Sequence, residues 1–280
     1  MDINAEPDHG EWEDSFHKYY QKGIPAPEAS KKAVHFPFEL MEKGQYRFLT
    51  GISPVKEVKE LAKANGCTVT MFITANYFMA IQDYVEQLKG PEKKAMMGRI
   101  VMNIPVDLRQ MFPSKTMKNF FISFTPFIDL RLGHYELEEI IEYLNGYMKL
   151  NYSPKRISPY VTRNVKNERK VLVRLLPLWI KNLLMPFIYV RFGERGYTTS
   201  VSNLGLVKVP DEIKDRIEAF EFYPAPSEVN KIKMCMCAYG SELRLSFGQM
   251  TENTEIEKYF FRRLRKMGIP VKIESNIPQD

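Results

Sequence analysis

The 280-residue sequence is poor in the residues that carry most metal and redox chemistry. It has three cysteines, an odd number, and no recognisable secretory signal, which argues against a disulfide framework. We therefore expect reduced thiols and a cytoplasmic protein. Cys235 and Cys237 are expected to point to opposite faces of one strand, a poor arrangement for a shared metal ion. The sequence thus predicts no metal site.

Long uninterrupted apolar runs are also absent. The most apolar stretch, residues 171–192, is interrupted by charged residues and prolines, among them Pro177, Lys181 and Pro186. A membrane-spanning helix needs about 20 mainly apolar residues, so we predict no transmembrane segment. A surface-lying amphipathic segment is one alternative. We favour a buried or groove-lining helix pair for these residues.

The common catalytic and nucleotide-binding motifs are missing. The sequence contains no G-x-x-x-x-G-K-[ST], G-x-G-x-x-G, H-E-x-x-H or G-x-S-x-G. Of its four histidines, His9, His17 and His35 lie near the N-terminus and His134 lies in a Gly-His-Tyr turn. Histidine is the commonest general base near neutral pH. An enzyme built from this chain must therefore use another base or borrow one.

The composition itself is that of a globular protein, with 44% hydrophobic residues and a net charge of +6. Residues 1–17 contain six acidic residues and no Lys or Arg, so the remaining chain carries a charge of +12. This net positive charge is compatible with binding an anionic ligand such as a nucleotide or CoA. It is equally compatible with a role in solubility alone. The basic cluster at residues 262–266 ends a helix and lacks a nucleic-acid-binding signature. We predict no nucleic-acid binding; a nucleic-acid binder remains an alternative that steep salt dependence would reveal.

Periodicity predicts one α+β domain with a mixed, largely antiparallel sheet and helices packed on it. Residues 1–44 are expected to be an acidic, proline-containing lead-in with a short helical patch, and residues 45–280 the domain. Runs of strand-forming residues predict strands at residues 46–52, 99–106, 119–125, 197–206 and 271–274. Residues 231–247 are predicted to form a hairpin whose second arm alternates and so has one wet face. Three-four apolar spacing predicts helices at residues 55–62, 70–88, 137–147 and 256–267, the last opened by a capping box of Thr254 and Glu257.

Two polar segments at strand ends are candidate sites. In the loop of residues 107–118, Arg109 can pair with Asp107 to fix the loop or bind a ligand phosphate, and the spacing favours the first. In the strand at 197–206, alternation places Ser200 and Ser202 on one face. Their hydroxyls can bond each other and the backbone, or offer a donor to a ligand oxyanion. Asn203 and the following Gly205 are typical of a bulge.

These segments resemble a known family. The strings Ile104-Pro105-Val106-Asp107-Leu108-Arg109, Phe112-Pro113-Ser114-Lys115-Thr116, Asn119-Phe120 and Ser202-Asn203-Leu204-Gly205 resemble bacterial alcohol acetyltransferase-like proteins of the chloramphenicol acetyltransferase and condensation-domain superfamily. The resemblance implies a two-lobed CoA-dependent acyltransferase fold with a tunnel between the lobes. The family's general base belongs to an H-x-x-x-D-G motif in the first lobe, which these 280 residues do not contain.

The resemblance therefore implies a second, C-terminal lobe that is inactive alone. It assigns Ser202 as an oxyanion donor and Asn203, Ser200, Arg109 and Asn119 to the tunnel wall. It implies acyl-CoA or a carrier-bound acyl thioester as co-substrate, a small alcohol or amine as acceptor, and no tightly bound cofactor. The alternatives are a non-catalytic binding module and a half-enzyme completed by a separate first-lobe chain.

Overall fold

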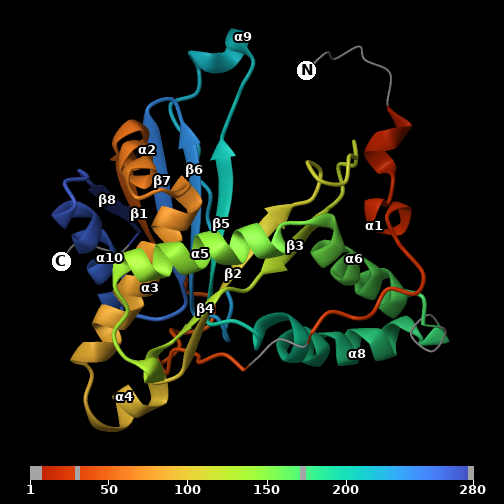
Figure 1. Ribbon diagram of the computed structural model, residues 1–280, viewed down its shortest axis with the longest axis horizontal. Coiled ribbons are helices and arrows are strands. Elements are labelled where there is room, and N and C mark those ends of the chain that lie inside the picture. The colour runs from red at the N-terminus through yellow and green to blue at the C-terminus, as the bar shows by residue number, and fades with distance from the viewer. Residues whose placement is uncertain (1–7, 29–31, 171–174, 277–280) are drawn as a thin grey trace.

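The computed structural model describes residues 8–28, 32–170 and 175–276, which form a twisted sheet with helices packed against it (Figure 1). The strands are β1 (Arg47–Pro54), β2 (Arg99–Asp107), β3 (Phe121–Phe124), β4 (Phe127–Asp129), β5 (Thr199–Leu206), β6 (Ile232–Tyr239), β7 (Glu242–Gln249) and β8 (Lys272–Ser275). The helices are α1 (Ser15–Lys18), α2 (Val55–Ala64), α3 (Val69–Gln87), α4 (Gly90–Met96), α5 (Leu137–Asn151), α6 (Pro154–Glu168), α8 (Leu178–Ile188), α9 (Asp211–Lys214) and α10 (Glu255–Lys266). Short helical turns are η1 (His9–Trp12), η2 (Leu130–Leu132) and η3 (Tyr189–Glu194).

The sheet has eight strands in the order β3-β2-β5-β6-β7-β1-β8, with β4 also paired to β2. The pairs β2–β5 and β5–β6 are parallel and the others are antiparallel. The predicted α+β fold with a mixed, largely antiparallel sheet is thus confirmed. The predicted hairpin is also present, because β6 and β7 pair directly across Gly240-Ser241.

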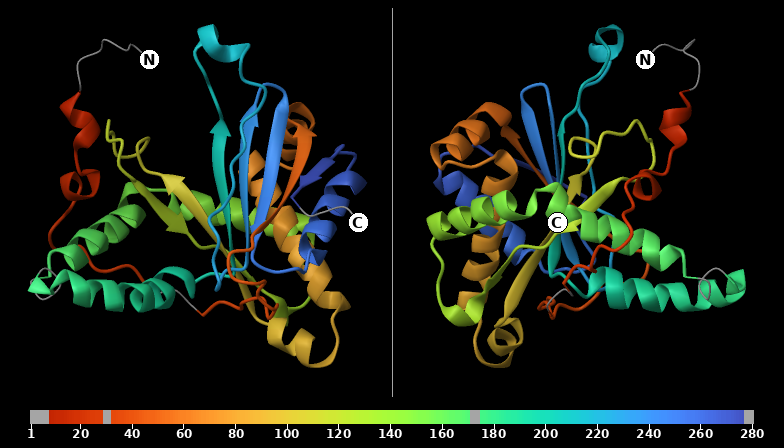
Figure 2. Two further views of the ribbon diagram at one scale, coloured as in Figure 1. Left: turned by 180° about the vertical axis from the view of Figure 1, so that it is seen from behind. Right: turned by 45° about the vertical axis from the view of Figure 1, so that its right-hand side comes forward.

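One face of the sheet is covered by α3 and α10, which enclose the main hydrophobic core (Figure 2). The α3 helix is apolar on almost every side, as expected of a helix buried in the centre of a domain. It begins at Val69, one residue earlier than predicted, because the Thr68 hydroxyl caps it by accepting a hydrogen bond from the Met71 N–H at 3.2 Å. Core rings such as Tyr77, Phe247 and Phe260 pack edge to face.

The opposite face, called here the second face, corrects two expectations. Cys235 and Cys237 lie on the same face of β6, since residues two apart in a strand share a face. Ser246 pairs with Cys235 and is buried rather than wet, with its hydroxyl 3.0 Å from that of Thr50. The segment between β5 and β6 covers this face; for example, the Cys237 thiol donates to the Phe220 carbonyl.

The N-terminus of α10 corrects the predicted capping box. The Thr254 side chain makes no capping hydrogen bond. The Asn253 Oδ1 instead accepts from the Glu255 N–H at 3.0 Å. The Glu257 side chain turns inward and is 1% exposed.

The apolar stretch before β5 also differs from the prediction. Helix α8 contains no buried residue, so the expected buried helix pair is wrong for this helix; residues 171–174 of the same stretch lie outside the described residues. Within the described residues, no helix is both long and apolar enough to cross a membrane.

The sheet divides between β2 and β5, and this division positions the candidate site. The two strands pair only at Met102–Thr199 and Asn103–Ser200. Beyond this point β2 pairs with β3 while β5 continues beside β6. Figure 1 shows the two strands diverging like the arms of a V. We call this place the β2–β5 split.

Candidate functional site

A cavity of about 650 Å³ lies beside the β2–β5 split. Its walls come from β2, β3, α5, α6 and the segment just before β5, with Phe16 from the N-terminal segment. Side-chain amides, aromatic rings and one arginine dominate the lining. They include Asn103, Asn119, Asn151, Asn164, Tyr147, Tyr160, Tyr197, Phe121 and Arg163. Such a surface suits a ligand with both polar and apolar parts.

Three polar side chains lie on the second face of the sheet at this split. Ser200 and Ser202 were predicted from the sequence, and Asn103 was not. Asn103 and Ser200 are register partners, and Ser202 follows two residues later on β5. The predicted placement of Ser200 and Ser202 on one face is therefore present. Asn103 lines the cavity, and its Oδ1 is buried without a hydrogen-bond partner among the described residues. An unpaired buried acceptor is unfavourable unless a ligand or water completes it.

Ser202 is half-buried and pairs in register with Cys235. In the described part of the chain its hydroxyl makes no hydrogen bond and is an available donor on β5, but neither Ser202 nor Ser200 is among the residues that line the cavity. Its neighbour Asn203 is engaged instead. The Asn203 Nδ2 donates to the Thr70 hydroxyl at 2.8 Å, and its Oδ1 accepts from the Gly205 N–H at 2.7 Å.

The predicted bulge is present at Asn203, because the β5–β6 register shifts between Asn203 and Leu206. Gly205 has φ +80°, a left-handed conformation that glycine adopts without strain. Asn203 thus holds β5 to the first turn of α3. Its contacts make it a positioning residue in this structure.

Arg109 is occupied by the loop that follows β2. Its Nη1 lies 2.6 Å from Asp107 Oδ1, and its Nη2 donates to the carbonyls of Thr116 and Lys118 at 2.9 and 2.8 Å. The planar guanidinium therefore joins both ends of the loop. Asn119, at the end of this loop, is exposed and lines the cavity.

Replacing Arg109 by lysine is expected to destabilise the protein by about 1–2 kcal/mol, because an ammonium cannot reach three acceptors with the geometry of the fork. Urea unfolding measures this loss, and limited proteolysis should show earlier cleavage in residues 110–118. Arg131→Lys, which alters an ion pair with Asp129 away from this loop, is the control for proteolysis. An unchanged unfolding midpoint would show that Arg109 does not hold the loop.

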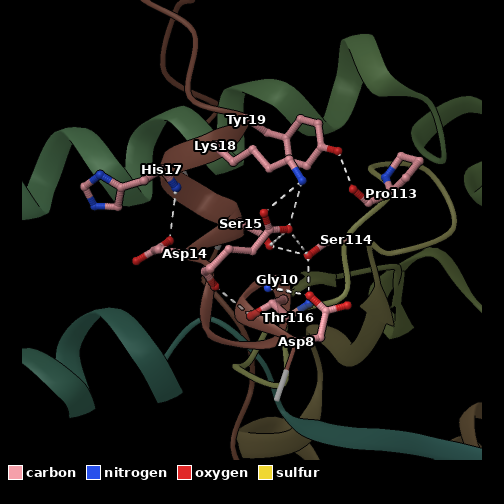
Figure 3. A network of polar contacts seen from close by, with 11 residues as sticks. Asp8, Gly10, Asp14, Ser15, His17, Lys18, Tyr19, Pro113, Ser114 and Thr116 are labelled. Atoms are coloured by element: carbon pink, nitrogen blue, oxygen red, sulfur yellow. Dashed lines mark hydrogen bonds and ion pairs between the residues drawn. The ribbon is translucent and has the colours of Figure 1, made fainter. Parts of the chain in front are cut away.

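The N-terminal segment packs over the same loop (Figure 3). The Ser114 hydroxyl donates to Glu13 at 2.6 Å, and Thr116 donates to the Glu13 carbonyl at 2.7 Å. Phe16 and Tyr19 pack on Phe120. Hydrogen bonds to Ser114 and Lys18 lower the pKa of Glu13. The acids of the lead-in thus hold the loop in place from outside.

None of the four histidines lines the cavity. His17 contacts Glu168 at 2.9 Å, and His134 contacts Glu86 at 2.6 Å, which raises the pKa of His134. His35 is half-buried near Asn230, and burial lowers its pKa, so the imidazole is neutral. Since His35 is absent from the cavity wall, it is not placed to take a proton from a ligand there.

The wall of the cavity carries few charged side chains. Arg163 lies 5.4 Å from the centre of the Tyr160 ring and supplies positive charge at the wall. Burial raises the pKa of Tyr197 to about 12, so its phenol stays protonated as a donor. The described residues bring together no group of three His, Cys, Asp or Glu side chains able to hold a metal ion. The site can bind and orient a ligand; its wall holds one carboxylate, that of Glu28, and no imidazole.

The comparisons with known proteins agree with this geometry. Residues 26–164 match the family model of alcohol acetyltransferase. The chain superposes on TRI3 trichothecene 15-O-acetyltransferase from Fusarium sporotrichioides with a TM-score of 0.54 and 11% identity, covering 86% of this chain and 48% of that one. It also resembles the condensation domain of the enacyloxin polyketide synthase, with a TM-score of 0.49 and 12% identity, covering 85% and 44% of the two chains.

A third likeness is to the wax ester synthase/diacylglycerol acyltransferase from Marinobacter aquaeolei VT8, with a TM-score of 0.46 and 12% identity, covering 90% of this chain and 54% of that one. No curated protein matches the sequence. The chain thus spans about half the length of these solved structures. The family-model match over residues 26–164 and the fold shared with TRI3 agree with the resemblance seen in the sequence: the chain is similar to alcohol acetyltransferase-like proteins.

Proposed function

We propose that these 280 residues form the second lobe of an O-acyltransferase. The lobe would bind an acyl thioester, either acyl-CoA or a carrier-bound acyl group, and a small alcohol or amine acceptor. The observation that supports this most is the cavity beside the β2–β5 split; Ser202 lies outside its wall, on β5 just beyond the split. The name of TRI3 as an O-acetyltransferase agrees with oxygen as the acceptor atom.

The chemistry divides between binding and proton transfer. The acceptor oxygen attacks the thioester carbonyl, the C–S bond breaks, and the acceptor loses its proton. As the carbonyl oxygen gains negative charge, the Ser202 O–H donates a hydrogen bond to it in this proposal. The acceptor's proton has no imidazole to receive it in the cavity wall. We therefore place the general base outside these 280 residues, on the same polypeptide or on another chain.

The 280-residue chain alone should transfer acyl groups slowly, because general base catalysis contributes about 10²–10⁴-fold. The test is release of thiol from acetyl-CoA in the presence of alcohols of increasing length, with and without imidazole in the buffer. We expect imidazole to raise the protein-dependent rate at least about tenfold. Ser202→Ala should lower the rescued rate about 10²-fold, as loss of an oxyanion donor does.

Ser241→Ala, at the tip of the β6–β7 hairpin, is the matched control and should leave the rescued rate unchanged. Rapid turnover without imidazole would show that these residues contain their own base. Equal rescue of the wild type and Ser202→Ala would remove Ser202 from the chemistry. Binding of acyl-CoA without any rescue would favour the alternative of a non-catalytic binding module.

One observation favours the half-enzyme completed by a partner chain as a second candidate. Beyond the split, β5 has no strand beside it on the β2 side among the described residues, and Leu204 and Leu206 are 58% and 59% exposed. An open strand edge with apolar side chains is a site for pairing with another lobe. A chain carrying an H-x-x-x-D-G lobe that co-purifies and restores turnover would establish this candidate.

A further inference from the structure

Helix α8 exposes an unusual amount of apolar surface. Leu178, Trp179, Leu183 and Phe187 are 69–73% exposed, and the helix contains no buried residue. At 100° per residue these side chains and their neighbours spread around most of the helix rather than forming one stripe. Exposed contiguous apolar surface of this kind marks an interaction site. The chemistry of the surroundings indicates what would cover it.

The surroundings of α8 are strongly basic. Residues 155–191 contain nine Lys or Arg and a single acid, Glu168, whereas the whole chain has a net charge of only +6. The excess of positive charge is therefore concentrated in this segment, and the rest of the chain is slightly acidic. On α6, Lys155, Arg156, Arg163 and Lys166 are all exposed. Figure 1 shows α6 above α8 on the right-hand side of the molecule, where the two helices approach each other at their outer ends.

We propose that α8 is a membrane-surface anchor, lying in the interface of a bilayer that contains anionic lipids. An apolar helix surrounded by basic residues is complementary to acyl chains below anionic headgroups. At 11 residues α8 is much shorter than the roughly 20 needed to span, so the helix would lie in the plane of the interface. Trp179 near its start and Tyr189 just after its end are the residue types that prefer this depth.

The charge favours lipid over a protein occupant. A protein partner would need an apolar groove bordered by acidic residues to match this edge, whereas an anionic bilayer presents both features continuously. The exposed sides of α8 also span more than one flat face, which a fluid acyl layer can surround. The inference stands apart from the proposed acyl transfer, since neither α8 nor the exposed bases of α6 named above, Arg163 excepted, line the cavity.

The test uses the full chain with Trp12→Phe, which leaves Trp179 as the sole tryptophan reporter. The protein is mixed with vesicles of phosphatidylcholine alone or with added phosphatidylglycerol. We expect co-sedimentation and a blue shift of Trp179 emission with the mixed vesicles, and much weaker binding to phosphatidylcholine alone. Leu183→Glu with Phe187→Glu should lower partitioning at least about tenfold, because two apolar contacts become charged.

The matched control is Leu132→Glu with Leu150→Glu, two exposed leucines away from α8, which should change partitioning less than about twofold. Lys155→Gln with Lys166→Gln should weaken binding to the anionic vesicles severalfold. Circular dichroism confirms that each variant is folded. Absence of binding to either vesicle, or equal binding by the α8 variant, would refute the anchor. Self-association that the α8 variant abolishes, without vesicle binding, would identify a protein interface instead.

Discussion

Between about pH 5 and pH 8, the wild-type protein is expected to lose up to about 4 kcal/mol of folding free energy that a Glu257→Gln variant retains. Glu257 is 1% exposed, and neither carboxylate oxygen has a hydrogen-bond partner among the described residues. Burial raises its pKa to about 8, and the nearby acid Glu255 adds to the rise. Folding therefore keeps this carboxyl protonated over a range where the unfolded chain ionises it.

The sign follows from proton binding. Below the unfolded pKa of 4.5 both states are protonated, and the contribution to stability is complete. As the pH rises toward the folded pKa, the unfolded chain releases a proton that the folded chain holds, which costs about 1.36 kcal/mol per pH unit. Glutamine does not titrate, so this loss is absent from the variant.

Chemical denaturation at a series of pH values measures the difference between the two proteins. Other titrating groups such as His35 and His134 affect both equally and cancel in the difference. Glu60→Gln, which alters an exposed ion pair with Lys56 on α2, is the matched control and should show a difference below about 0.5 kcal/mol. Parallel curves for the wild type and Glu257→Gln would show that Glu257 is ionised in the folded protein.

Glu257 also shows where sequence reasoning failed. Thr254 followed by Glu257 is a common signature of a helix start, and α10 does start there. The motif cannot show whether the third residue turns back to the cap or inward, because that depends on the helix face against α3. Local patterns of this kind give an element's position more reliably than the environment of one side chain.

Strands were predicted well where strand-forming residues formed continuous runs bounded by turn residues. The β6–β7 hairpin follows from the glycine turn and the alternation of its second arm, and β1 was predicted as a strand from its residue types. Helix α6 was missed although Ile157, Val161 and Val165 repeat every four residues and are buried. Pro159 within the helix obscured the pattern. The order of strands in the sheet was not predictable, because it depends on contacts between residues far apart in the chain.

The candidate site could be predicted in part for the same reason. Period two placed Ser200 and Ser202 on one face from the sequence alone. Asn103 and Tyr197 were missed, since only the pairing of β2 with β5 brings them to the cavity. An asparagine within the apolar strand Arg99–Asp107 was the available signal. Ser246 was predicted to be exposed to solvent, but the segment between β5 and β6 covers the second face of the sheet. No short sequence pattern shows that a distant loop packs there.

Gly51→Ala is expected to destabilise the protein by about 2–3 kcal/mol, an overpacking cost unusual for a single methyl group. Gly51 lies in β1 between Leu245 and Ile273 in register. A Cβ atom at this position would lie 2.1 Å from Cε1 of Phe261. The Phe261 ring is 6% exposed and is packed against other core rings, so it cannot move aside cheaply.

A double-mutant cycle identifies the cause. Phe261→Leu removes the ring edge that the new methyl would meet, so Gly51→Ala should cost at least about 1 kcal/mol less in the Phe261→Leu background. Gly146→Ala in α5 is a control that should change stability in the opposite direction. Its added Cβ meets no atom within 4 Å, and alanine in a helix interior should stabilise the protein by up to about 1 kcal/mol. Additive costs at positions 51 and 261 would show that the close approach of β1 to α10 is not what requires glycine. A full rescue would instead show that one ring, held by its neighbours, sets the spacing between the sheet and the helix that also buries Glu257.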